Sequence, residues 1–287
     1  MPSIKVGTEN SGAIELHYND RGAGKPIVLI HGYPLDGNSW ERQERVLLEH
    51  GYRCITYDRR GFGHSSRPST GYDYDTLAAD LKALLDHLAC AEEVVLVGFS
   101  MGTGEVTRYL GTYGSAGVSK AVLIGSIPPY LLEKVPANVF DGIKQGIVAD
   151  RYAFFDSFLG NLYNADVSIP DRLSDAALRA SSQVAAGSGA YAALASIDSW
   201  LADFRGDLAK IDIPVLAIHG AADRIAPLGV TTARLRDEHL IDDLTVVEIP
   251  DGPHNVCWTH PDEVNSALLS FVGSEAGDRP AAMAATG

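Results

Sequence analysis

The sequence is poor in cysteine and in basic residues, and it has no apolar run long enough to cross a bilayer. Its three cysteines, Cys54, Cys90 and Cys257, are an odd set without metal-ligand spacing, which argues against a disulfide framework and predicts no metal site. Only 23 Lys and Arg residues face 37 Asp and Glu residues, giving a formal charge of −14. That charge disfavours nucleic acid and anionic membrane surfaces as partners and favours a small neutral molecule.

The first residues also lack the apolar core of a secretory signal, so we expect a cytoplasmic protein. Hydrophobic residues make up 46% of the 287 residues and charged residues 21%, as in an ordinary globular protein. This length suits either one large α/β domain or two smaller ones.

The chain is organised around Gly98-Phe99-Ser100-Met101-Gly102, which follows the apolar run 94–97 and precedes a segment of helical composition, 105–110. Strand, sharp turn and helix in this order place a serine at the tip of the turn, and the flanking glycines allow the strand and helix to approach closely. The pentapeptide Gly-x-Ser-x-Gly is common by itself, so the assignment depends on the apolar strand before it and the helix after it. We therefore predict that Ser100 is a nucleophile.

Apolar runs alternate with helical patterns along the chain, and this alternation predicts an α/β fold with a mostly parallel sheet covered by helices on both faces. The runs are residues 27–30, 53–58, 94–97, 121–124, 215–218 and 244–249. Residues 1–126 and 206–272 are predicted to form the core. The aromatic-rich segment 127–205 has no strand pattern and is predicted to be an inserted helical cap. Residues 273–287 are predicted to be a disordered tail.

A serine nucleophile needs a base and an acid that orients it, and both should lie at the carboxyl ends of strands. Asp223 follows the run 215–218, and His254 follows the run 244–249. The resulting order Ser, Asp, His is that of α/β-hydrolases. Among the alternatives, His31 and His219 are expected to brace loops, and Asp58 is expected to be tied into the loop that follows it.

An acyl-transfer site also needs donors for the oxyanion, and the backbone N–H groups of Met101 and Tyr33 are the candidates. We further expect Pro34 to bias Tyr33 towards an extended conformation, turning its carbonyl towards a peroxide or an amine in the site. The candidate residues of the substrate pocket are Pro34, Tyr130, Trp200 and Ile225.

Several motifs together resemble the cofactor-free haloperoxidases, which are α/β-hydrolase-fold perhydrolases and also include γ-lactamases and aryl esterases. The motifs are His31–Gly37 with Ser39-Trp40, Tyr57–Gly63, Gly71–Thr76, Gly98–Glu105, and Pro253-His254 with Trp258–His260. The resemblance extends to about Val272. It implies Ser100, Asp223 and His254 as a triad, the N–H groups of Tyr33 and Met101 as oxyanion hole, and no metal, haem or other cofactor.

The resemblance implies that the serine is acylated by a small ester, carboxylic acid or lactam. Water then gives the acid, while hydrogen peroxide gives a peracid that oxidises halide. The alternative is that γ-lactamase or carboxylesterase activity is the main activity. A ligand-binding receptor on the same fold, without catalysis, is a much weaker alternative. The sequence departs from the family pattern at His64, Asn255 and Cys257, which could alter substrate preference. Whether the chain forms a homo-oligomer stays open.

Overall fold

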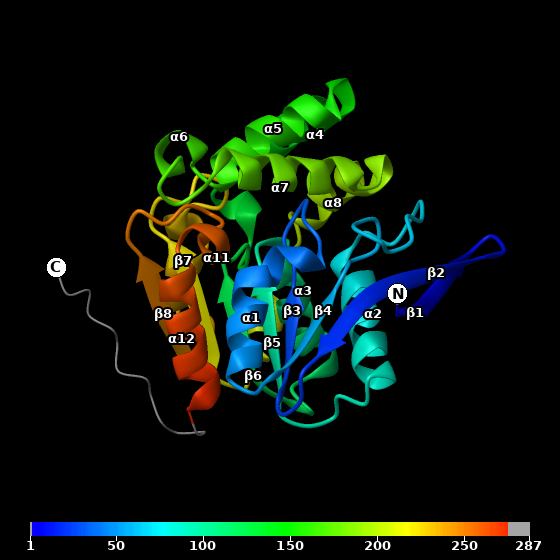
Figure 1. The fold of residues 1–287 in the computed structure, drawn as a ribbon, viewed down its shortest axis with the longest axis vertical. Coiled ribbons are helices and arrows are strands. Elements are labelled where there is room, and N and C mark those ends of the chain that lie inside the picture. The colour runs from blue at the N-terminus through cyan, green and yellow to red at the C-terminus, as the bar shows by residue number, and fades with distance from the viewer. Residues whose placement is uncertain (1, 275–287) are drawn as a thin grey trace.

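A computed structural model describes residues 2–274 of the chain, and these form one eight-stranded sheet with helices around it (Figure 1). The strands are β1 (Ser3–Glu9), β2 (Gly12–Arg21), β3 (Pro26–Ile30), β4 (Arg53–Tyr57), β5 (Val94–Phe99), β6 (Val118–Ile124), β7 (Val215–Gly220) and β8 (Leu244–Ile249). The core helices are α1 (Glu41–Glu49), α2 (Tyr74–His87), α3 (Met101–Tyr113), α9 (Arg205–Leu208), α10 (Thr232–Asp237), α11 (Val256–Thr259) and α12 (Pro261–Gly273).

The sheet has the order β1-β2-β4-β3-β5-β6-β7-β8 and is parallel from β4 to β8, with the antiparallel hairpin β1–β2 at one edge. Every residue of β5 and β7 is buried, because these strands are apolar towards both faces, as central parallel strands are. Helices α1 and α12 pack together on one face of the sheet, and α2 and α3 pack together on the other (Figure 1). The predicted fold class is confirmed.

The turn between β5 and α3 holds Ser100 in a rare backbone conformation, with φ 53° and ψ −118°. Both neighbouring glycines are required by close packing. A Cβ on Gly98 would lie 2.4 Å from the carbonyl oxygen of Gly102, and a Cβ on Gly102 would lie 2.3 Å from the carbonyl oxygen of Ile30. The glycines therefore let α3 start directly against β3 and β5, and this fixes Ser100 at the carboxyl edge of the sheet.

Five of the helices between β6 and β7 cover the carboxyl edge of the sheet (Figure 1). They are α4 (Ala137–Ala149), α5 (Arg151–Leu162), α6 (Ala165–Ser168), α7 (Asp175–Gly187) and α8 (Ala190–Ser199). The backbone N–H of Phe204 donates to the carbonyl of Pro129 at 2.9 Å, so the chain enters and leaves this segment at one point. The division into a core and a cap of residues 127–205 stays a prediction.

The predicted tail is only partly within the described residues. Gly273 is the last residue of α12, and the Lys120 ammonium donates to the carbonyl of Ser274 at 2.6 Å, so these two residues belong to the folded core. Residues 275–287 lie outside the part of the chain that the structure describes.

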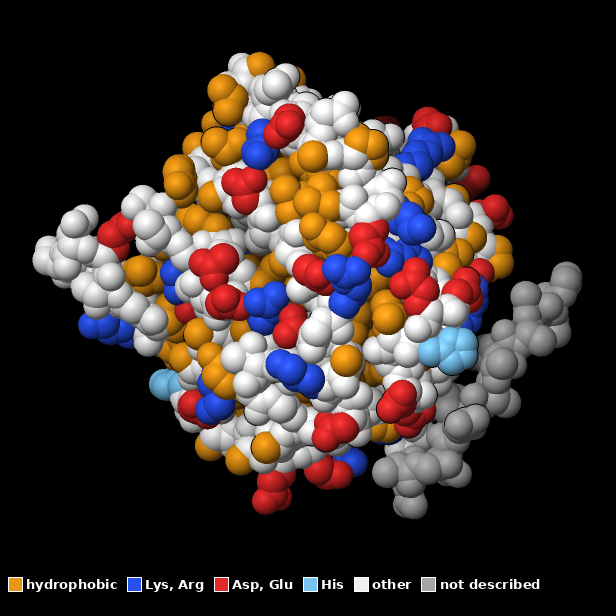
Figure 2. Space-filling view, turned by 180° about the vertical axis from the view of Figure 1, so that it is seen from behind, with side chains coloured by type: hydrophobic (Ala, Val, Ile, Leu, Met, Phe, Trp, Pro, Cys, Tyr) orange, Lys and Arg blue, Asp and Glu red, His pale blue; other side chains and the backbone are white. Residues whose placement is uncertain are grey.

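The surface seen from behind carries acidic and basic side chains interspersed, without a continuous basic patch (Figure 2). Among the described residues, no helix combines the length and the apolar character needed to cross a membrane. Large exposed hydrophobic side chains are concentrated on the cap. Those on the cap are Val139, Val148, Tyr152, Val167 and Tyr191, and Tyr113 of α3 is exposed on the core.

Candidate active site

The structure brings the three predicted catalytic side chains together at the carboxyl edge of the sheet. Ser100 Oγ lies 2.7 Å from His254 Nε2, and His254 Nδ1 lies 2.6 Å from Asp223 Oδ2. All three residues are buried beneath the cap. This arrangement lets the imidazole accept the serine proton while its other nitrogen stays bonded to the carboxylate.

Asp223 is held by more groups than His254 alone. Its Oδ1 accepts hydrogen bonds from the backbone N–H groups of Ile225 and Ala226, each at 2.8 Å. Its Oδ2 faces His254 and also lies 3.0 Å from Nε2 of His219. Burial alone would raise the pKa of Asp223, but the two facing imidazoles outweigh it and hold the pKa below its usual value. The carboxylate therefore stays ionised.

His219 is a contact of this site that sequence reasoning did not find. Its Nε2 lies 2.9 Å from the carbonyl of Ala226, which can only accept, so Nε2 carries the proton and also points at Asp223. Its Nδ1 lies 2.8 Å from the Thr232 hydroxyl. His219 does brace the loop 220–226, as predicted, but it also donates to the acid. Its position at the end of β7, four residues before Asp223, was the only signal.

The two predicted oxyanion donors flank Ser100. Met101 is the first residue of α3, where an N–H group has no partner within the helix. The N–H of Tyr33 makes no hydrogen bond within residues 2–274. A Cβ on Gly32 would lie 3.0 Å from Cβ of Ser100, so the loop that carries Tyr33 passes directly against the serine. Both N–H groups are thus placed beside Ser100 and have no other partner there.

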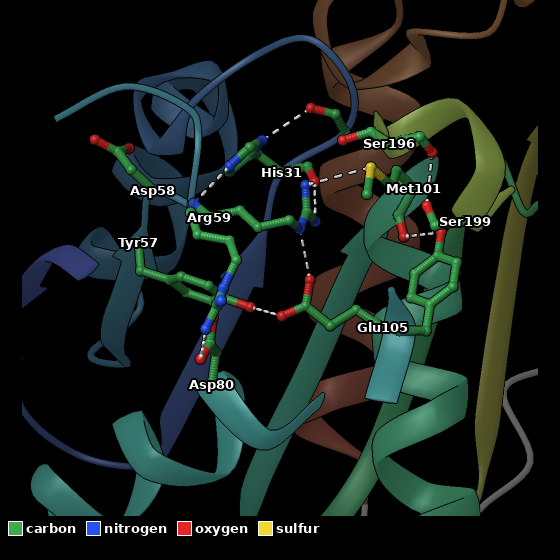
Figure 3. A network of polar contacts seen from close by, with 12 residues as sticks. His31, Tyr57, Asp58, Arg59, Asp80, Met101, Glu105, Ser196 and Ser199 are labelled. Carbon is green, nitrogen blue, oxygen red and sulfur yellow. Dashed lines mark hydrogen bonds and ion pairs between the residues drawn. The ribbon is translucent and has the colours of Figure 1, made fainter. Parts of the chain in front are cut away.

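A buried polar network lies beneath the two segments that carry the predicted oxyanion donors, Tyr33 and Met101 (Figure 3). Arg59 forms an ion pair with Glu105 at 2.7 Å and donates to the carbonyl of His31 at 2.8 Å. The Tyr74 hydroxyl donates to the carbonyl of Met101 at 2.9 Å. Burial raises the pKa of Glu105, while the Arg59 guanidinium opposes that rise. The network therefore connects the loop before Tyr33 to the first turn of α3.

A cavity of about 190 Å³ opens from Ser100 into the cap. Its walls include the predicted residues Trp200 and Ile225. Most of the lining is aliphatic or aromatic, and Arg224 is its one charged side chain. The other lining residues are Ile127, Leu131, Val135, Val139, Phe140, Ile143, Phe158, Ala226, Pro227 and Val230. The site therefore suits an apolar group attached to the reacting carbonyl.

Two predicted pocket residues do not line this cavity. The guanidinium of Arg205 lies over the Tyr130 ring, 5.2 Å from its centroid, and the Tyr130 carbonyl accepts from Arg234. Pro34 is buried within the loop after β3. Val139, Phe140 and Ile143 of α4 also line the cavity and were not predicted to, although their spacing of one and three residues was a helical signal for a shared face.

The three departures from the family pattern lie outside the cavity lining. The Asn255 side chain accepts from the Trp258 N–H at the start of α11, and Cys257 is buried, which raises the pKa of its thiol. His64 lies in the loop after β4, near Asp58 and His17. That group is the one set of histidine and acidic residues, within residues 2–274, whose ligand atoms are close enough to hold a metal ion.

Comparisons with known proteins agree with this fold. A family profile described as alpha/beta hydrolase fold matches residues 25–261. A Synechocystis protein named "Putative non-heme chloroperoxidase" is 56% identical over 278 residues, covering 95% of this chain and all of the relative. The chain belongs to the non-heme haloperoxidase family of α/β-hydrolases.

Two further members support the same assignment. The non-heme haloperoxidase of Rhodococcus erythropolis is 36% identical over 272 residues, which is 92% of this chain and 98% of that protein. The crystal structure of a bromoperoxidase from Bacillus anthracis superimposes with a TM-score of 0.90 at 42% identity, covering 95% of this chain and 99% of the other. This haloperoxidase-family chain is therefore an enzyme of the α/β-hydrolase class.

Proposed function

We propose that this enzyme is a serine hydrolase and perhydrolase that acts through an acyl-enzyme on Ser100. The observation that carries the proposal is the continuous set of contacts from Ser100 through His254 to Asp223. A serine hydroxyl becomes nucleophilic near neutral pH only when a base removes its proton, and His254 is within hydrogen-bond distance to do so.

In the first half-reaction, Ser100 Oγ attacks the carbonyl carbon of an ester, carboxylic acid or lactam while His254 takes the serine proton. Asp223 stabilises the resulting imidazolium without taking its proton. The N–H groups of Tyr33 and Met101 donate to the oxyanion of the tetrahedral intermediate. His254 then returns the proton to the leaving alcohol, water or amine, and the acyl group stays on Ser100.

In the second half-reaction, His254 deprotonates either water or hydrogen peroxide, which attacks the acyl carbon and releases Ser100. Water yields a carboxylic acid and hydrogen peroxide yields a peracid. A peracid transfers one oxygen atom to bromide or chloride in solution and gives hypohalous acid plus the carboxylate. The halogenation that the names of the relatives describe is therefore a consequence of peracid release and requires no halide site.

The cavity limits the acyl groups that fit. At about 190 Å³ it has room for a short aliphatic or a single-ring aromatic group, and its apolar lining favours uncharged chains. Trp200 Nε1 is buried without a hydrogen-bond partner in the described structure, so it can donate to a polar atom of the substrate. Small acyl esters and short carboxylic acids are the proposed substrates.

The test compares the wild-type enzyme with Ser100→Ala in two assays run side by side: p-nitrophenyl acetate hydrolysis, and bromination in acetate with hydrogen peroxide. We expect the variant to lose both activities by about 10⁴-fold or more, because no other group supplies the nucleophile. A fluorophosphonate probe should label only the wild type. Equal bromination by both proteins would show that this activity does not pass through Ser100. A dominant bicyclic γ-lactam opening would favour the lactamase alternative.

A further inference from the structure

Three side chains outside the active site converge from separate segments. His17 lies in β2, Asp58 directly follows β4, and His64 lies in the next loop. One nitrogen or carboxylate oxygen from each residue lies within 4.8 Å of the others. The Asp58 carboxylate points away from the Arg59–Glu105 network in Figure 3, so this cluster is separate from the support of the active site.

The backbone holds the three segments at a fixed spacing. The N–H of Asp58 donates to the carbonyl of His17 at 2.9 Å. The N–H of His17 donates to the Ser65 hydroxyl at 2.9 Å, and that hydroxyl in turn donates to the carbonyl of Asp58. The positions of His17 and Asp58 therefore do not depend on His64.

His17 has one ring nitrogen bound and one free. Its Nδ1 lies 3.0 Å from the carbonyl oxygen of Pro2, which can only accept, so in the neutral ring the proton sits on Nδ1. Nε2 then carries a lone pair, and it has no hydrogen-bond partner within residues 2–274 although the residue is only 7% exposed. Metal-binding histidines are typically oriented in this way by a backbone carbonyl on the second nitrogen.

The other two residues complete a ligand set. Asp58 Oδ1 accepts from the N–H of Gly37, while Oδ2 lies 3.4 Å from Nδ1 of His64. Ligands about 2.1 Å from a tetrahedral ion are roughly 3.4 Å apart. Since the ligand atoms lie within 4.8 Å of one another, the cluster has to contract by about 1.4 Å at most. His64 can supply that movement, because its side chain is 53% exposed.

We propose that His17, Asp58 and His64 bind one divalent transition-metal ion, with Zn²⁺ as the best-fitting ion and solvent in the fourth position. Two imidazoles and one carboxylate suit Zn²⁺, whereas Ca²⁺ and Mg²⁺ prefer oxygen ligands throughout. The ion would connect the N-terminal hairpin to the loop after β4, so its effect is on stability. This proposal is independent of the proposed catalytic function.

Titration calorimetry of the metal-stripped full-length protein with zinc chloride tests the proposal. We expect one site in the wild type and an affinity at least about tenfold lower in His64→Gln, because one of three ligands is lost. His50→Gln is the matched control, since His50 is also exposed and its ring bonds only to the carbonyl of Val46. His64 is preferred to the buried His17 because its replacement leaves the fold undisturbed.

A second measurement reports on the expected role. Zinc should raise the thermal unfolding midpoint of the wild type and of His50→Gln, but not that of His64→Gln, because a ligand that binds only the folded state stabilises it. The proposal is wrong if the wild type binds no zinc, if His64→Gln binds it as tightly as the wild type, or if Ca²⁺ and Mg²⁺ bind equally well.

Discussion

The core and the cap meet at Ser100, but they contribute to the site in different ways. On the core side, Asp223 accepts hydrogen bonds from two backbone N–H groups and faces two imidazoles, and the Arg59–Glu105 pair is buried beneath. On the cap side, the cavity wall consists almost entirely of apolar contacts. Polar contacts have strict geometry and apolar contacts do not. We therefore expect the core to determine the rate of the chemistry and the cap to determine which acyl group reacts.

The largest effect should follow from changing the acid on the core side. Asp223→Asn keeps the shape of the side chain but no longer stabilises the imidazolium of His254, so kcat should fall by about 10⁴-fold, as in serine proteases. The assay is p-nitrophenyl acetate hydrolysis. The matched control is Asp166→Asn, which removes the exposed partner of the neighbouring Arg224. A loss of less than tenfold in Asp223→Asn would mean that the core carboxylate is not essential.

The buried pair under the site should matter for stability. Glu105→Gln leaves the Arg59 guanidinium buried without its counter-charge and should lower the free energy of unfolding by about 3–5 kcal/mol. The exposed pair Lys82–Asp86 offers the control, because Asp86→Asn should change it by about 0–1 kcal/mol. Urea unfolding measures both. Similar values for the two variants would show that the core side is no more rigidly held than the surface.

His219 provides a test of positioning within the core. His219→Leu removes a hydrogen bond to a charged group, worth about 1.5–3 kcal/mol, and should lower kcat by roughly ten- to a hundredfold. His219→Asn retains a donor and should recover part of the loss. If kcat falls equally in the two variants and their pH profiles are unchanged, His219 contributes packing alone and no hydrogen bond that matters for catalysis.

The same variant should alter the response to acid. Because His219 helps to lower the pKa of Asp223, its removal should raise that pKa. A lowered folded-state pKa gives stability that is present above the unfolded value, about 3.9, and is lost as the pH falls through the folded value. In His219→Leu the folded-state pKa lies closer to the unfolded value, so the total loss should be smaller and should be complete at a higher pH than in the wild type. Urea unfolding at a series of pH values below about 5 measures the difference.

The smallest effect should come from the cap and should change selectivity alone. Ile143→Ala enlarges the cavity on its α4 side and removes apolar contacts with the acyl chain of the substrate. The ratio of kcat/KM for a hexanoate ester to that for an acetate ester should change by about fourfold per methylene contact, while the acetate rate stays the same. A fall in the acetate rate as large as that of His219→Leu would contradict the proposed division of roles.

Sequence patterns predicted the core more fully than the cap for a physical reason. Ser100, Asp223 and His254 could be placed because the ends of parallel strands share one edge of the sheet. Tyr130 could not be placed in this way, because its ring orientation depends on Arg205, which lies 75 residues away along the chain. The Arg59–Glu105 pair and the contact of His219 with Asp223 likewise depend on packing in three dimensions. The place of His219 at a strand end predicted that it braces a loop but not that it contacts Asp223.

The bond from the Phe204 N–H to the Pro129 carbonyl has a practical consequence. The chain leaves the core at Pro129 and re-enters it at Phe204, and these two residues are bonded to each other. A helical segment from another protein could therefore replace the residues between them without disturbing the pairing of β6 with β7. Chimeras made at these two residues should inherit their turnover from the recipient and their chain-length selectivity from the donor.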